Sequence, residues 1–242
     1  MPQRSRSRAR PGQRVADGEA GPRDIAPGTV TAIKPQARDP ERVNVYIDEQ
    51  FAFGMGSQIS LDMGLRLGEQ LDAARIAALR AADDIGKATN AALNLLAMRP
   101  RSIREIRDRL RQKDYAPEAI DAAIEKLEGW NYVDDADFAR FWVENRVTHR
   151  PRGRRLLAQE LWQKGIDRET AAEALEDSDL DEHQAALDIA RSKMRSYAGL
   201  ERAVVYRRLG GLLGRRGFGY DIVKPVLDEV LGELDGADAA TP

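Results

Sequence analysis

The chain has 242 residues, a net charge of −2 and an apolar fraction of 42%, so it is long enough for one large domain or two small ones with a real core. It contains no cysteine and only two histidines, which excludes disulfides, thiolate metal sites, a cysteine nucleophile and a histidine-rich metal centre. No run of about 18 apolar residues occurs, so we expect no membrane span and a cytoplasmic protein.

The small net charge conceals strong local segregation of charge. Residues 1–24 hold six arginines and three acids, residues 138–155 hold six arginines and one acid, and residues 173–182 hold six acids and no base. Residues 1–27 are predicted to be a disordered basic arm, which either tethers the protein to DNA or only keeps it soluble. Residues 233–242 are predicted to be an acidic disordered tail.

Residues 28–71 are predicted to form a small β-sheet region. Thr29–Ile33 is β-branched, Val43–Ile47 alternates with period two, and the alternation resumes at Phe51 after a polar break. We therefore expect a hairpin with a third strand nearby, covered by the helices that follow. The packed face and its continuation are expected to hold Val43, Val45, Ile47, Phe51 and Phe53.

From Asp72 to Met98 the pattern becomes helical. Asp72 is the expected N-cap, and the alanine-rich sequence that follows favours a helix. Gly86 is a candidate point at which this segment divides into two helices.

One pattern then occurs three times. Leu110, Leu161 and Leu213 stand 51 and 52 residues apart, and six further columns keep these offsets, which indicates a true repeat. These columns are Ile106/Leu157/Leu209, Lys113/Lys164/Arg216, Asp114/Gly165/Gly217, Tyr115/Ile166/Phe218, Ile120/Ala171/Val223 and Ile124/Leu175/Leu227.

Each repeat is predicted to contain three helices, over residues 72–135, 136–180 and 181–232. Ser102 and Glu105 predict a capping box at the start of a second helix. Asp114 and its glycine counterparts predict a left-handed helix end, and Pro117 fits the first turn of a third helix. In the second repeat, the first helix is expected to be carried by Phe138, Phe141 and Trp142.

The predicted fold class is therefore mainly α, with three tandem three-helix repeats and a small N-terminal β-sheet region. Because such units bury neighbour against neighbour, we expect an elongated curved rod. Two helices joined by a glycine turn also give the helix-turn-helix outline, which leaves open a stand-alone DNA-binding protein that uses these units and the basic arm.

We find no constellation for catalysis and no cofactor motif, so the chain is predicted not to be an enzyme. Asp134, Asp135 and Asp137 fit a helix cap better than a metal site, and His149 is expected to be a surface residue. The density of cations in 140–155 would attract phosphates or an acidic protein surface, unless the acids of 173–182 pair with it. The candidate contact residues for a partner or nucleic acid are Arg140, Arg146, Arg150, Arg152, Arg154, Arg155, Lys164, Arg207, Arg208, Arg215 and Arg216.

The segment 91–230 also carries a set of motifs in a fixed order. They are Leu95–Ser102 with Glu105 and Leu110, Leu127 with Tyr132–Asp135, Phe138-Ala139 and Arg146, Gly153 with Leu161 and Lys164–Ile166, and Arg208-Leu209 with Leu213, Arg216–Phe218 and Ile222. Together they resemble the RecX regulatory proteins of bacteria, and residues 29–71 are similar to the N-terminal extension of longer members.

The resemblance implies tandem three-helix repeats and binding in the helical groove of RecA–DNA filaments. It further implies inhibition of strand exchange, ATP hydrolysis and coprotease activity, and hence a place in DNA repair and the SOS response. RecA is therefore the implied partner. From the residues themselves we expect a monomeric protein that also contacts DNA through its basic surface and arm. No catalytic residue is carried over from the family.

Overall fold

The structure is a computed structural model that describes residues 25–239. Most of the predicted basic arm, residues 1–24, and the last three residues of the predicted tail lie outside the described residues. The chain divides into two compact units, Met1–Gly86 and Lys87–Pro242.

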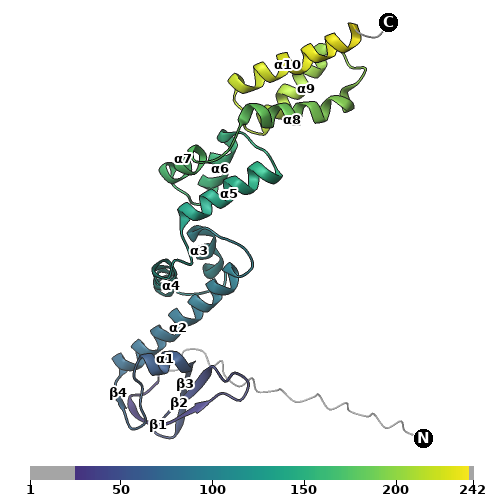
Figure 1. Ribbon diagram of the computed structural model, residues 1–242. Helices are drawn as coiled ribbons and strands as arrows, with labels where there is room; N and C mark the ends of the chain where they lie inside the picture. Colours follow the sequence, from purple (N-terminus) through teal and green to yellow (C-terminus); the bar gives the residue numbers. More distant parts are fainter. Residues whose placement is uncertain (1–24, 240–242) are drawn as a thin grey trace, which may run out of the picture. The chain divides into compact units, whose positions relative to one another are not determined.

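The first unit is built on a four-stranded antiparallel sheet in the order β3-β2-β1-β4 (Figure 1). The strands are β1 (Gly28–Pro35), β2 (Arg42–Ile47), β3 (Gln50–Gly56) and β4 (Gln70–Leu71), and helix α1 (Ser57–Asp62) follows β3. The predicted hairpin and third strand are therefore present. The short β4, which pairs with β1, was not predicted.

A bulge makes one predicted core residue wrong. Val45 pairs with Phe53, but the next residue, Tyr46, pairs with Phe51, so the register shifts between these two pairs. A bulge inserts one unpaired residue and turns the side chains beyond it. Phe53 is consequently buried, whereas Phe51 is 40% exposed and meets Tyr46 edge to face, with ring centroids 6.0 Å apart.

Helix α2 (Ala73–Leu96) begins where the sequence predicts, since the Asp72 carboxylate accepts a hydrogen bond from Arg75 N at 2.7 Å. Gly86 does not divide it, which corrects that expectation. A Cβ on Gly86 would lie 2.2 Å from Ile59 Cδ1 of α1. The glycine therefore allows close packing of α1 against α2 instead of ending the helix.

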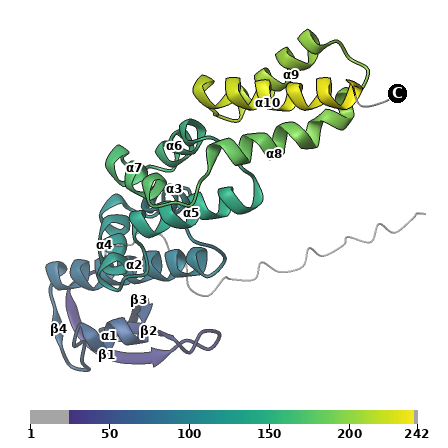
Figure 2. The same ribbon diagram turned by 45° about the horizontal axis from the view of Figure 1, so that its top comes forward.

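The second unit contains the predicted three-helix repeats. The first repeat has the end of α2, α3 (Ile103–Arg111) and α4 (Pro117–Gly129); the second has α5 (Asp135–His149), α6 (Arg154–Gln163) and α7 (Arg168–Glu176); the third has α8 (Glu182–Met194), a short 3₁₀ turn, α9 (Arg202–Arg215) and α10 (Tyr220–Ala239). Helices α8, α9 and α10 lie alongside one another in both views (Figure 2). The mainly helical fold class with an N-terminal sheet is confirmed.

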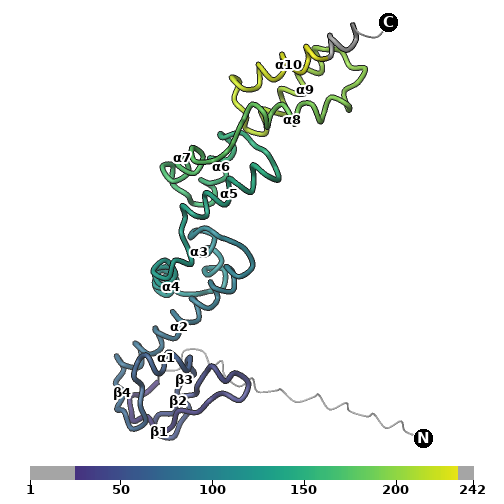
Figure 3. Tube along the Cα trace, in the orientation of Figure 1, coloured from purple at the N-terminus to yellow at the C-terminus, as the bar shows by residue number. Residues whose placement is uncertain are grey.

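The second helix of every repeat ends in the same way, and the chain path through these ends can be followed in Figure 3. Asp114, Gly165 and Gly217 have φ values of 61°, 91° and 88°. In each case the next amide donates to the carbonyl five residues earlier, at 3.0 to 3.3 Å. This is the Schellman ending that the sequence pattern predicts.

The repeated apolar columns form the cores of the repeats. Leu110, Leu161 and Leu213 are fully buried, as are their partners one turn earlier. Phe141 is an exception to the prediction for α5, because it is 41% exposed while Phe138 is buried. Phe138 lies on the inner face of α5 with Trp142, with which it stacks at 5.8 Å, and Phe141, three positions on from Phe138, lies at the margin of that face.

Successive repeats are joined by one recurring contact. The N-cap of the second helix in one repeat donates to the C-cap carbonyl of the second helix in the next. Ser102 Oγ donates to Lys164 O at 2.7 Å, and Gly153 N donates to Arg216 O at 2.9 Å. We call these two contacts the inter-repeat hydrogen bonds.

Glycine permits the close approach at both junctions. A Cβ on Gly165 would lie 2.6 Å from Arg104 Cβ, and a Cβ on Gly217 would lie 2.3 Å from Leu156 Cβ. The first repeat has no three-helix repeat before it and carries Asp114 at this position. The two glycines thus allow the neighbouring repeat to pack closely, and they also adopt the left-handed backbone that ends the helix.

Helix α10 continues to Ala239, past residue 233, where the sequence predicts a disordered tail. The extension adds one backbone hydrogen bond per residue to a helix already fixed by burial of Val226, Leu227 and Val230, so propagation is favourable. Across residues 25–239, no helix combines the length and apolar character that crossing a membrane requires.

Gly217→Ala should lower the free energy of unfolding by about 2–4 kcal/mol, because the new methyl group both meets Leu156 and occupies a left-handed backbone. The matched control is Gly214→Ala in α9, where an added Cβ meets nothing within 4 Å. There the gain in helix propensity should raise stability by about 0.5–1 kcal/mol. Urea denaturation of both variants checks this, and equal effects would show that the close approach is not a constraint.

Candidate partner-binding surface

The basic segment 138–155 runs through α5, a connecting turn and the start of α6. Arg146 and His149 lie in the last turn of α5, where the helix dipole favours cations. Pro151 prevents the helix from continuing, and Gly153 then serves as the N-cap of α6. The cations of the segment therefore project from three different local structures.

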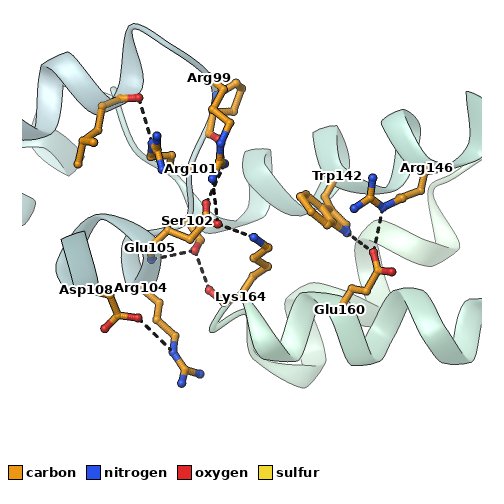
Figure 4. Close-up of polar contacts among 12 residues, drawn as sticks. Arg99, Arg101, Ser102, Arg104, Glu105, Asp108, Trp142, Arg146, Glu160 and Lys164 are labelled. Atoms are coloured by element: carbon orange, nitrogen blue, oxygen red, sulfur yellow. Dashed lines mark hydrogen bonds and ion pairs between the residues drawn. The ribbon is translucent and has the colours of Figure 1, made fainter. Parts of the chain in front are cut away.

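Two of the predicted contact residues neutralise a buried carboxylate. Glu160 Oε2 accepts hydrogen bonds from Trp142 Nε1 at 2.9 Å and from Arg146 Nε at 3.0 Å (Figure 4). Arg152 pairs with the other oxygen of Glu160, and the Arg146 guanidinium lies 4.1 Å from the centroid of the Trp142 ring. Arg146 and Arg152 thus hold the turn and α5 against α6.

Lys164 is also committed within the chain. Its Nζ pairs with Glu105 of α3 and lies 4.8 Å from the centroid of the Trp142 ring. Glu105 accepts two further hydrogen bonds from Arg99, at 2.9 and 3.1 Å (Figure 4). These pairs surround the inter-repeat hydrogen bond from Ser102, so Lys164 serves the junction of the first two repeats.

The predicted capping box at this junction forms only in its first half. Ser102 Oγ accepts from Glu105 N at 3.2 Å, but the Glu105 carboxylate turns to Arg99 and Lys164. Burial acts to raise the pKa of Glu105, yet the hydrogen bonds from Arg99 and Lys164 outweigh it and leave that pKa below its ordinary value.

Asp134 and Asp135 at the start of α5 cap helices, as predicted, whereas the Asp137 carboxylate pairs with Arg140. Asp134 accepts from the amides of Ala136 and Asp137 at 2.6 and 3.0 Å. Asp135 reaches back to the first repeat and accepts from Ile103 N at 2.9 Å; burial, followed by the nearby Asp134 charge, raises its pKa. Within residues 25–239, no group of three acidic, histidine or cysteine side chains is placed to hold a metal ion.

Arg154 serves the junction of the second and third repeats. Its Nη1 donates to Leu175 O at 2.8 Å, its Nε lies 3.7 Å from Glu182 Oε2, and its amide donates to Glu182 Oε1 at 2.9 Å. The sequence left open a pairing between the basic segment and the acids of 173–182, and Arg154 makes such a pair with Glu182.

Four predicted arginines come together at the same junction. They line a pocket of about 400 Å³, here called the junction pocket, which is formed by the turn before α6, the first turn of α6 and the end of α9. Its lining residues are His149, Arg150, Pro151, Arg152, Leu156, Arg215 and Arg216. The inter-repeat hydrogen bond from Gly153 to Arg216 fixes this arrangement.

The remaining predicted residues lie elsewhere. Arg140 pairs with Asp137 on the same helix, and Arg208 lies 5.9 Å from the centroid of the Tyr197 ring. Arg155 and Arg207 are exposed to solvent. The candidate residues thus do not form one surface but a junction pocket, a set of internal ion pairs and separate exposed cations.

Sequence reasoning missed four residues of this region. His149 was expected only at the surface, where it does lie, but it also lines the junction pocket with Pro151 and Leu156. Glu160 was not singled out because a lone glutamate in a helix resembles a solvated residue. The available signal was its spacing, one position before the buried Leu161, next to the face that carries the core.

Known proteins match the chain over nearly all the described elements. Family models match in chain order as the RecX N-terminal domain (residues 28–72) and the first, second and third RecX three-helix domains (88–127, 134–175 and 181–227). Regulatory protein RecX of Bacillus licheniformis is 33% identical over 207 residues, which cover 85% of this chain and 79% of the relative.

The chain belongs to the RecX family. Regulatory protein RecX of Clostridium botulinum is 30% identical and matches over 84% of this chain and 96% of its own length. A crystal structure of regulatory protein RecX superposes with a TM-score of 0.71 at 25% identity over 83% of this chain and 98% of its own. RecX from Lactobacillus salivarius gives a TM-score of 0.56 at 28% identity over 61% of this chain and 97% of its own.

Glu160→Gln should lower the free energy of unfolding of this RecX protein by about 1–3 kcal/mol, since the part-buried Arg146 and Arg152 lose their counter-charge. In a background with Trp130→Phe and Trp162→Phe, Trp142 is the chain's remaining tryptophan. Because it donates to Glu160, its fluorescence maximum should shift. The matched control is Glu173→Gln on the exposed face of α7, which should change stability by less than about 0.5 kcal/mol. An unchanged Trp142 emission together with unchanged stability would contradict the role of Glu160.

Glu105→Gln should destabilise the protein by about 1–2 kcal/mol at neutral pH. Because folding lowers the pKa of Glu105, its ionised form stabilises the fold above the ordinary glutamate pKa, and this contribution is lost as the pH falls through the folded-state value. The difference between the variant and the unmodified protein should therefore vanish in acid. Denaturation over a pH series tests this against Glu125→Gln on α4; a difference that persists in acid would contradict the assignment.

Proposed function

We propose that the protein binds the RecA–DNA filament and restrains its recombinase, ATPase and coprotease activities in DNA repair and the SOS response. The observation that carries this proposal is the match to all four RecX domain models along the chain. The proposal contains no catalytic step, in keeping with relatives that are named regulatory proteins. Because the proposed partner is a filament assembled on DNA, the proposal also implies that the protein acts in the cytoplasm.

The mechanism that we propose is a wedge between neighbouring filament subunits. ATP turnover in a filament requires its subunits to move relative to one another, and a ligand that binds one arrangement better than another shifts the equilibrium toward it. The inter-repeat hydrogen bonds and the ion pairs around them support this mechanism, because they resist separation of one repeat from the next. Contacts made by different repeats would then add to one another.

The contact surface that we infer includes four arginines that face solvent, namely Arg150, Arg155, Arg207 and Arg215. Arg146, Arg154 and Lys164 have partners within the chain, so their loss would weaken the fold before it weakened binding. Exposed cations chiefly accelerate encounter with an anionic partner. We therefore expect the inhibition to weaken as the salt concentration rises.

RecA-catalysed ATP hydrolysis on single-stranded DNA should slow when the full chain is added. If few molecules suffice per filament, this slowing should occur at protein concentrations well below that of RecA. A hydrolysis rate that stays constant up to an excess over RecA would overturn the proposal. The alternative, a protein that binds DNA alone, predicts slowing only when enough protein is present to cover the DNA.

The inferred contact surface is tested by Arg155→Glu combined with Arg207→Glu. This variant should need roughly tenfold more protein for half-maximal inhibition, corresponding to about 1.4 kcal/mol of binding free energy. A matched charge reversal, Arg109→Glu with Arg111→Glu on the exposed side of α3, should change the requirement by less than about threefold. Equal effects in both variants would show that overall charge, not this surface, determines binding.

A further inference from the structure

We propose that the junction pocket is a phosphate site that holds one nucleotide unit of a single-stranded nucleic acid. Four arginines, Arg150, Arg152, Arg215 and Arg216, line one space of about 400 Å³. Its lining contains no carboxylate. Arg152 pairs with Glu160 outside the lining, but the lining sets no acid beside Arg150, Arg215 and Arg216. A cluster of arginines without an acid among them recognises a phosphate through paired N–H groups.

The positive charge of the pocket persists in spite of Glu160. Burial and then the neighbouring charges of Arg146, Arg150 and Arg216 lower the pKa of Arg152, although Arg152 itself pairs with Glu160. Like charges in partial burial repel one another, and an anion placed among them removes that repulsion. The pocket therefore favours an anionic occupant.

The pocket is fixed by packing that has nothing to do with charge. A Cβ on Gly153 would lie 2.3 Å from Gly217 O, and Gly153 N donates to Arg216 O. The end of α9 is thereby held against the turn before α6, at the boundary of the second and third repeats (Figure 1). A site whose cations are positioned in advance loses less conformational entropy when it binds.

The walls favour a nucleotide over a bare ion. Pro151 and Leu156 supply apolar surface, and the His149 imidazole supplies a flat ring beside the arginines. A volume of about 400 Å³ lies within the usual range for small-molecule sites and exceeds what a single phosphate fills. A sugar or base can lie on the apolar wall while its phosphate meets the guanidiniums.

This inference rests on the proposed function only for its biological setting, a partner that contains DNA. It goes further in assigning a direct nucleic-acid contact to one pocket of the chain. It also predicts that this contact does not require RecA, so the two proposals can fail separately.

The test uses the full chain and a fluorescein-labelled oligothymidylate of about 12 nucleotides, without RecA. Arg150→Gln, Arg215→Gln and Arg216→Gln are combined in one variant, and fluorescence anisotropy is measured over a range of salt concentrations. The affinity should fall by roughly tenfold or more, and the dependence of log affinity on log salt should become less steep by about 0.7 for each phosphate that the variant no longer neutralises.

The matched control removes the same number of charges from the exposed side of α3, through Arg104→Gln, Arg109→Gln and Arg111→Gln. Its affinity for the oligonucleotide should change by less than about threefold. A second pocket variant combines Arg150→Lys, Arg215→Lys and Arg216→Lys, which keeps the charge but removes the paired N–H groups. Its affinity should lie between that of the glutamine pocket variant and that of the α3 control. Thermal denaturation should show that all three variants remain folded.

Competition distinguishes the sources of the phosphate. Unlabelled oligothymidylate should displace the probe at lower concentration than ATP or inorganic pyrophosphate, because only the strand extends beyond the pocket. A site for free nucleotides would show the reverse order and would overturn the proposal. Displacement by oligoglutamate as effective as that by oligothymidylate would assign the pocket to an acidic peptide instead and would also overturn it.

Equal loss of affinity in the pocket variant and the α3 control would show that the pocket has no special role. If the protein slows RecA but its affinity for the oligonucleotide does not depend on the pocket, the phosphate site fails and the proposed function stands. If RecA is unaffected while binding depends on the pocket, the phosphate site stands and the proposed function fails.

Discussion

The second unit depends on a single recurring contact, in which the capping residue that begins one helix donates a hydrogen bond to the carbonyl that ends another. Ser102 meets Lys164 in this way, and Gly153 meets Arg216. Both ends of a helix carry backbone groups that its own turns cannot satisfy. Pairing the start of one helix with the end of another satisfies a donor or an acceptor at each junction, and it leaves room for no side chain at Gly165 and Gly217.

The same contact explains why the basic residues have such different roles. At the first junction, Lys164 and Arg99 converge on Glu105, so positive charge is neutralised. At the second junction, Arg154 finds Glu182, but Arg215 and Arg216 arrive beside Arg150 and Arg152 with no acid lining the space between them. Equivalent positions in consecutive repeats therefore form neutralising ion pairs at the first junction and a positively charged pocket at the second. This difference is what makes the second junction the better candidate for an anionic ligand.

Much of the fold was predictable because its determinants are local. Asp72 and Asp134 cap helices where the sequence places them, since a cap needs only the three residues that follow it. The residues that were wrongly predicted depend on contacts with other helices and strands. Phe51 follows a bulge set by pairing with β2, and Gly86 faces Ile59 from another helix. Neither the shifted register nor the approaching helix can be recognised from the residues adjacent to Phe51 and Gly86.

The sequence by itself determined the three repeats, the left-handed ends of their second helices, the N-terminal sheet and the clustering of arginines in 138–155. Periodicity and capping are properties of a few consecutive residues, so they can be recognised without knowledge of the folded chain. Only the tertiary structure decided which arginines are free to meet a partner. That choice depends on whether folding brings a carboxylate within reach of the cation. Glu160 is 14 residues from Arg146 along the chain, and Glu105 is 59 residues from Lys164. Ion pairing acts over a few ångströms of space, and separation along the chain does not reveal it.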